Sequence, residues 1–88
     1  MIVYQVSKKM FFLSNGIDYA AAVDMNCDVK LFTSQKKAEK EFDELVNSYV
    51  AVYKSEPKDI EFSAIHRAVE IKSGDIRMII EFLKKETR

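Results

Sequence analysis

The chain has 88 residues, of which 48% are hydrophobic and 32% charged, and 14 acidic side chains balance 14 basic ones. This length suits a single domain covering residues 1–88, because two smaller pieces could not each bury a core without metals or disulfides. The zero net charge excludes a strong overall attraction to nucleic acid or to an anionic membrane, and the presence of one cysteine excludes an internal disulfide.

The first residues do not have the pattern of a secretory signal or a membrane anchor. The apolar stretch from Ile2 to Val6 is broken by polar and basic residues at 7–9, whereas a signal needs its positive charge first and an unbroken apolar run after it. No run approaches the roughly 18 apolar residues of a membrane span. Together with the single cysteine, these features predict a cytoplasmic protein without a membrane partner.

Three strands are predicted before the middle of the chain. Residues 2–13 alternate as a β-strand does, with one face formed by Ile2, Tyr4, Val6, Met10 and Phe12. The sequence Ser-Asn-Gly at 14–16 predicts a turn, because Asn and Gly tolerate positive φ. A second strand over residues 17–25 completes a hairpin, and residues 29–32 form a third strand after a turn at 26–28.

A long amphipathic helix is predicted over residues 34–53. Its apolar side chains recur with the i, i+3, i+4, i+7 spacing that places them on one stripe, namely Ala38, Phe42, Leu45, Val46, Tyr49, Val50 and Tyr53. Charged residues occupy most of the remaining circumference. Thr33 or Ser34 can cap the first turn, because either side-chain oxygen can accept from an unpaired amide. The helix therefore has one face to bury.

The segment after the helix has two interpretations. Pro57 ends the helix, since proline lacks an amide proton and disfavours helix in the residue before it. Residues 60–72 form a strand if a bulge near Ser63-Ala64 keeps one face consistent, and a Gly-containing turn at 73–75 then leads into a last strand over 76–85. Alternatively, both segments are helices, with the second capped by Asp75. The turn favours the hairpin.

These elements predict an α+β domain with the order β-β-β-α-β-β, in which one long helix packs on one face of a largely antiparallel sheet. A face that met only water should be polar, but large apolar residues remain on the face opposite the helix: Val3, Phe11, Leu13, Ile79 and Leu83. Such a patch predicts a protein partner, most simply a second copy in a homodimer. The alternative is that sheet twist and loops cover these residues. The first hypothesis is therefore a non-enzymatic accessory, adaptor or inhibitor protein.

The stretch Lys8-Lys9-Met10-Phe11-Phe12 supports a second hypothesis, a nucleic-acid-binding sheet. In such sheets, bases stack on aromatic rings while lysines, here Lys8 and Lys9, neutralise phosphates. However, the aromatic-rich RNP1 pattern is absent, and Phe11 and Phe12 point to opposite faces of a strand, so at most one of them can stack. A core strand with lysines that block unwanted pairing explains the same residues.

No catalytic, cofactor or metal site is predicted. His66 is the only histidine and has Glu70 four residues on as a modulating carboxylate, but no nucleophile is identifiable near it. Cys27 lies beside Asp28, whose negative charge disfavours a reactive thiolate. One Cys and one His do not supply the ligand spacings of a zinc site, and residues 24–28 lack the glycine and distal glutamate of a calcium loop. With two glycines in the chain, a phosphate-binding loop is also excluded.

Overall fold

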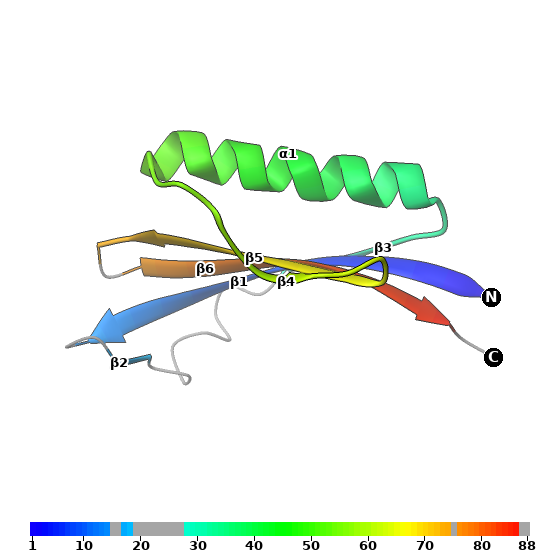
Figure 1. Cartoon of the computed structure of the whole chain (residues 1–88), viewed down its shortest axis with the longest axis horizontal. Coiled ribbons are helices and arrows are strands. Elements are labelled where there is room, and N and C mark those ends of the chain that lie inside the picture. Colours follow the sequence, from blue (N-terminus) through cyan, green and yellow to red (C-terminus); the bar gives the residue numbers. More distant parts are fainter. Residues whose placement is uncertain (15–16, 19–27, 75, 87–88) are drawn as a thin grey trace.

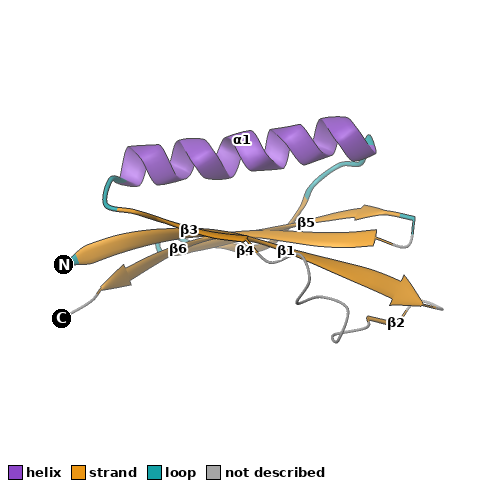
Figure 2. Cartoon of the chain, turned by 180° about the vertical axis from the view of Figure 1, so that it is seen from behind, coloured by secondary structure: helices purple, strands orange, loops and turns teal. Residues whose placement is uncertain are grey.

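The fold is an antiparallel sheet with one helix lying along one of its faces (Figures 1 and 2). The computed structural model describes residues 1–14, 17–18, 28–74 and 76–86, and the side chains of residues 1–10, 28–74 and 76–86. In chain order its elements are β1 (Ile2–Ser14), β2 (Ile17–Asp18), β3 (Asp28–Phe32), α1 (Gln35–Tyr53), β4 (Lys58–Phe62), β5 (His66–Ser73) and β6 (Ile76–Glu86). The predicted α+β class, with a long helix on an antiparallel sheet, is confirmed.

The two ends of the described chain form the centre of the sheet. β1 and β6 pair antiparallel from Ile2 opposite Glu86 to Phe12 opposite Ile76. β5 pairs with the other side of β6, and β4 pairs with β5. β3 and the two-residue β2 both pair with β1, β3 near its start and β2 near its end. Across most of its length the strand order is therefore β3-β1-β6-β5-β4.

The segment 58–73 is two strands rather than the predicted single bulged strand. The chain turns back at residues 63–65, where the Ser63 amide donates to the His66 carbonyl at 2.8 Å. The Ser63 hydroxyl also accepts from the His66 amide at 3.0 Å, which closes the turn. The predicted bulge at Ser63-Ala64 is thus wrong, and the register shift lies within β4, between Asp59 and Glu61. The fold therefore has one strand more than predicted. The helical alternative for residues 60–85 is excluded, because β4, β5 and β6 account for this part of the chain.

Part of the predicted N-terminal hairpin cannot be compared with the structure. β2 begins at Ile17, as expected for the second strand, and is described only through Asp18. Residues 15–16 and 19–27, which include Cys27 and most of the turn at 26–28, lie outside the described residues.

The helix begins and ends as its flanking residues dictate. Ser34 is its N-cap, and the serine hydroxyl accepts from the Lys37 amide at 3.4 Å, which satisfies one of the unpaired donors of the first turn. At the other end Lys54 adopts a left-handed conformation, with φ 51° and ψ 42°. Left-handed geometry ends a helix but strains most residues that have a Cβ, with Asn and Asp as the usual exceptions.

The core lies between α1 and the sheet. Phe42 from the helix meets the ring of Phe82 edge-on, with centroids 6.4 Å apart, and Tyr4 stacks on Phe82 at 6.0 Å. The fully buried set comprises Val6, Phe42, Ile71, Met78, Ile80 and Phe82. Because Met78, Ile80 and Phe82 point to the helix, the residues between them in β6 lie on the opposite face. We call that opposite face the open face of the sheet.

Candidate functional site

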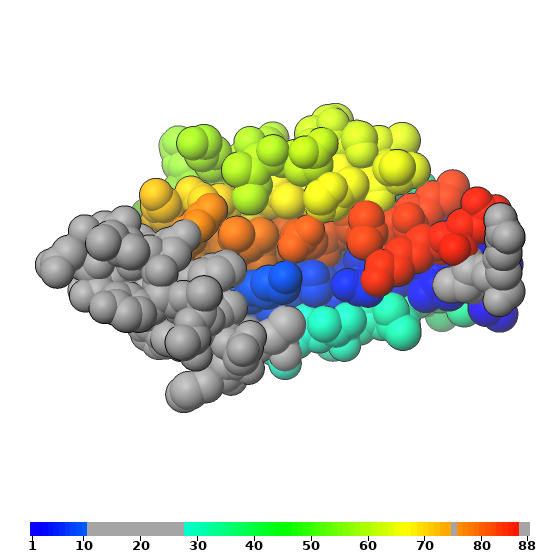
Figure 3. All heavy atoms as spheres, turned by 90° about the horizontal axis from the view of Figure 1, so that it is seen from below, coloured from blue at the N-terminus to red at the C-terminus, as the bar shows by residue number. Residues whose placement is uncertain are grey.

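Two surfaces are candidates for function: the open face of the sheet and a pocket beside the helix. Figure 3 shows the open face, on which β4, β5, β6, β1 and β3 lie side by side. Val3, Ile79 and Leu83 lie on it, as predicted, and each is half-buried. Phe11 and Leu13 occupy the same phase of β1, with Phe11 opposite Arg77, but their side chains lie outside the described part of the structure.

Among the described side chains, the most exposed apolar ones of the open face come from β3, which was not predicted to belong to this surface. Val29 pairs with Ser7, and Leu31 with Gln5, so both share the face of Val3 and Leu83. Val29 is 53% exposed and Leu31 66% exposed. In the sequence, Asp28 and Lys30 alternate with Val29 and Leu31, and this alternation indicates that the two apolar residues share one face of a strand.

The other half of the open face holds polar pairs. His66 Nε2 lies 2.9 Å from Glu81 Oε2, so the carboxylate partner of His66 is Glu81 on β6 and not Glu70. Glu70 instead accepts from Arg77 Nε at 2.5 Å, and its second oxygen lies 3.9 Å from Lys72 Nζ. Residues four apart on one strand are separated by about 13 Å, which explains why Glu70 does not reach His66.

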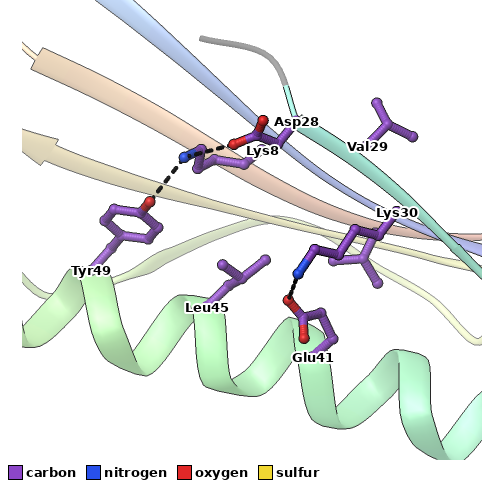
Figure 4. Close-up of a pocket in the computed structure, with 8 residues that line it drawn as sticks. Lys8, Asp28, Val29, Lys30, Glu41, Leu45 and Tyr49 are labelled. Atoms are coloured by element: carbon purple, nitrogen blue, oxygen red, sulfur yellow. Dashed lines mark hydrogen bonds and ion pairs between the residues drawn. The ribbon is translucent and has the colours of Figure 1, made fainter.

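A pocket of about 370 Å³ opens between α1 and the β1–β3 side of the sheet (Figure 4). Its lining consists of Val6, Lys8, Asp28, Val29, Lys30, Glu41, Leu45 and Tyr49. Figure 4 shows Lys8 with Asp28 and Tyr49 at one end, the pair of Lys30 and Glu41 at the other, and Leu45 between them. The pocket therefore combines an apolar middle with two charged ends.

Lys8 is held between strand and helix at one end of this pocket. Its Nζ donates to Tyr49 Oη at 2.9 Å and lies 3.1 Å from Asp28 Oδ2. The hydrogen bond with Tyr49, followed by the contact with Asp28, raises the pKa of Lys8 above its usual 10.5, although burial acts in the opposite direction. At neutral pH Lys8 is therefore a fixed cation, not a base or nucleophile.

The structure does not bring Lys8 and Lys9 onto one surface. Lys8 points to the helix, and Lys9, the next residue of β1, is exposed on the open face. Two adjacent strand residues reach opposite sides of a sheet, so they cannot contact the same phosphate backbone as a pair. The predicted nucleic-acid contact thus reduces to Lys9 alone on the open face.

A second hollow, of about 580 Å³, lies at the other side of the helix near the turn at 63–65. Arg67 is one of the residues that line it, with its guanidinium carbon 4.7 Å from the centroid of the Phe42 ring and 5.3 Å from that of Phe62. Asp43 lies 3.8 Å from this guanidinium. Arg67 therefore closes the edge of the core by stacking on two rings.

Within the described residues, no group of three or more His, Cys, Asp and Glu side chains is arranged to hold a metal ion. The same residues include no helix with both the length and the apolar character to cross a membrane. The comparisons with known proteins find no matching protein family, no matching curated protein and no matching solved structure.

Proposed function

We propose that this protein works by binding rather than by catalysis, and that it self-associates through the open face of its sheet. The observation that supports this most directly is the exposure of Val29 and Leu31 beside half-buried Leu83 on a face that the helix does not cover. Removal of such apolar side chains from water favours association by about 25 cal/mol per Å² of buried area. A reducing, cytoplasmic compartment suits the single cysteine.

The polar half of the open face favours the same role. Glu70 and Glu81 are already paired within the chain, to Arg77 and His66. A partner that covers them does not have to supply new counter-charges, so the cost of removing these groups from water is lower. The apolar half of the face thus consists of Val29 and Leu31 on β3 together with Val3, Ile79 and Leu83. Polar side chains of β1, β6 and β5, among them Gln5, Ser7, Arg77, Glu81 and Glu70, make up the rest of the described face.

A second copy of the chain is the partner that this division fits best. A two-fold axis that runs parallel to the strands above β1 places β3 of each copy over β6 of the other. Leu31 of one copy then meets Leu83 of the second, and Val29 meets Glu81. Gln5, Ser7 and Lys9 of the two copies lie along the axis, and the polar residues of β5 and β4 lie outside the contact. Closed two-fold dimers of this kind are the commonest protein assemblies.

The area of the open face sets the expected affinity of the homodimer. Five strands spaced about 4.8 Å apart, each with about eight residues, present about 600 Å² of projected area, and the apolar half is smaller still. Stable interfaces bury about 800 Å² per partner, so the homodimer belongs to the weak class. We expect it to form at micromolar rather than nanomolar protein concentration.

Sedimentation velocity across a protein series from about 1 to 200 µM, a range that covers weak interfaces, tests the proposal. Leu31→Lys is expected to keep the chain monomeric, because it places a charge against Leu83 of the second copy. Val52→Lys is the matched control: Val52 lies on α1 and is 69% exposed, against 66% for Leu31. It should dimerise as the wild type does.

Two outcomes would overturn the proposal. One is a strict monomer at every concentration, since the apolar half would then have no self-affinity. The other is a dimer that survives Leu31→Lys or Leu83→Lys while the variants remain folded by circular dichroism, because its contact would lie elsewhere.

A further inference from the structure

The pocket beside the helix contains two ion pairs. In one pair the anion is the exposed member, and in the other pair the cation is the exposed member. In the first pair, the side chain of Lys8 is only 15% exposed, whereas that of Asp28 is 73% exposed. Lys8 is also fixed from a second side by its hydrogen bond to Tyr49. The cation of this pair is therefore anchored, and the anion is the exchangeable member.

The second pair is built the other way round. The side chain of Glu41 is 23% exposed and that of Lys30 is 63% exposed, with 2.9 Å between Lys30 Nζ and Glu41 Oε1. Here the anion is anchored in the wall of the helix and the cation is exchangeable. The pocket thus has a fixed positive charge at one end and a fixed negative charge at the other (Figure 4).

The exchangeable members can be replaced by a ligand at little cost. An ion pair with a well-exposed partner contributes about 0–1 kcal/mol, because water screens it and a long side chain must be ordered. A ligand carboxylate that displaces Asp28, and a ligand ammonium that displaces Lys30, keep both anchored charges neutralised. Such a ligand also adds the burial of its own apolar part against Leu45 and Val6, which line the pocket between the two ends.

The spacing of the two ends defines the ligand. Asp28 and Lys30 are two residues apart on β3, or about 7 Å. Glu41 and Tyr49 are eight residues apart on α1, or about 12 Å. The two charges of the ligand should therefore be separated by about 7–12 Å. The ammonium and carboxylate of a free amino acid flank a single carbon and are too close together, whereas an extended tripeptide spans about 10 Å.

We propose that this pocket binds a short peptide with free ends, about three residues long, with an apolar side chain in the middle. The peptide carboxylate is received by Lys8 and Tyr49, its ammonium by Glu41, and its central side chain by Leu45. A volume of about 370 Å³ lies in the range of small-molecule sites.

The tripeptide Ala-Leu-Ala, its N-acetyl form and its C-terminal amide are the probes, titrated into ¹⁵N-labelled protein and followed by NMR. The free tripeptide is expected to shift the amide signals of the pocket residues and to saturate. Each capped form should bind about 10-fold more weakly, because it loses one charge-assisted hydrogen bond. Free leucine, which has both charges but not their separation, is the length control and should not saturate.

Variants of the pocket residues test separately which residue receives each end of the peptide. Lys8→Met should bind the free tripeptide and its amide equally, while it still discriminates against the acetylated form. Glu41→Gln should show the converse pattern. Asp28→Asn removes the exchangeable anion and should strengthen binding of the free tripeptide; because Asp28 is exposed, this variant tests the site even if Lys8→Met fails to fold. A merely structural role of these residues predicts no such crossed pattern.

The proposal is overturned if the free tripeptide does not bind, if capping either end leaves the affinity unchanged, or if the shifted signals lie outside the pocket. It is equally overturned if Asp28→Asn weakens binding. The monomer–dimer equilibrium of the open face is measured independently, so failure of either proposal leaves the other intact.

Discussion

Arg77 donates its Nε hydrogen to Glu70 across the β5–β6 hairpin, on the face of the sheet opposite α1. Glu70 is among the buried residues of the chain although it is charged. A carboxylate in such a place is stable only with a partner, since an unpaired buried charge costs several kcal/mol.

Replacement of Glu70 should therefore destabilise the fold. Glu70→Ala is expected to lower the free energy of unfolding by about 2 kcal/mol, because it removes the carboxylate that accepts from Arg77 Nε in a largely buried place. Glu61→Ala on neighbouring β4 removes an exposed glutamate and should change stability by less than about 0.5 kcal/mol. Urea denaturation of both variants provides the comparison, and similar losses would show that burial of Glu70 is not the cause.

Phe42 should be the most sensitive position of the helix. It is almost fully buried and touches Phe82 and Arg67 from the centre of α1. Phe42→Ala is expected to cost about 3–5 kcal/mol, a large part of the roughly 4–13 kcal/mol typical of a domain this size. Phe42→Leu should cost less because it leaves a smaller cavity. A thermal melt in which Phe42→Ala unfolds at the wild-type temperature would contradict the assigned core.

The raised pKa of Lys8 predicts a loss of stability at alkaline pH. Below about pH 10.5, the usual pKa of lysine, the side chain is largely protonated in both the folded and the unfolded chain, so its contribution is complete. Above that pH, the unfolded chain loses the proton first, and the contribution of Lys8 falls until the folded lysine also deprotonates. The difference in unfolding free energy between wild type and Lys8→Met should therefore shrink from pH 9 towards pH 12.

Lys9→Met is the control for that measurement, because it removes one positive charge from the neighbouring position on the other face. Chemical denaturation at each pH supplies the free energies. A difference between wild type and Lys8→Met that stays constant over this range would mean that the contacts with Tyr49 and Asp28 do not favour the charged lysine.

Lys54 offers a route to higher stability. Its left-handed conformation is strained for a residue with a Cβ and natural for glycine. Lys54→Gly is expected to raise the free energy of unfolding by about 1 kcal/mol, after allowing for the greater freedom of glycine in the unfolded chain. Lys54→Ala keeps the strain and should show no such gain in differential scanning calorimetry. An equal effect of both substitutions would point to the lost charge instead.

Local patterns were enough to predict the helix and the last hairpin. The stripe from Ala38 to Tyr53 and the Ser34 cap are visible over a few residues, and Gly74 with φ +59° marks the turn between β5 and β6. The break between β4 and β5 was missed because the turn at 63–65 contains neither Gly nor Pro. It is closed by the Ser63 hydroxyl, and a serine hydroxyl is a weaker turn signal than Gly, Pro, Asn or Asp.

The candidate pocket could not be predicted for a different reason. Lys8 meets Asp28, which is 20 positions away, and Tyr49, which is 41 positions away, and no local pattern encodes such contacts. In the strand pattern Lys8 looked like a charged interruption of an apolar face. Its stem is in fact buried beside the helix while its ammonium finds two partners. The open face was predictable, because strict alternation in β6 assigns Ile79 and Leu83 to one side.

The central pairing of β1 with β6 has a consequence for the biosynthesis of the protein. During translation β1 is made first among the strands, yet its principal neighbour is made after every other element. The sheet therefore cannot close until residue 86 has left the ribosome, and until then one long edge of β1 lacks its neighbour. Unpaired strand edges attract other chains, so this nascent protein should depend on chaperones more than a helical protein of equal length does.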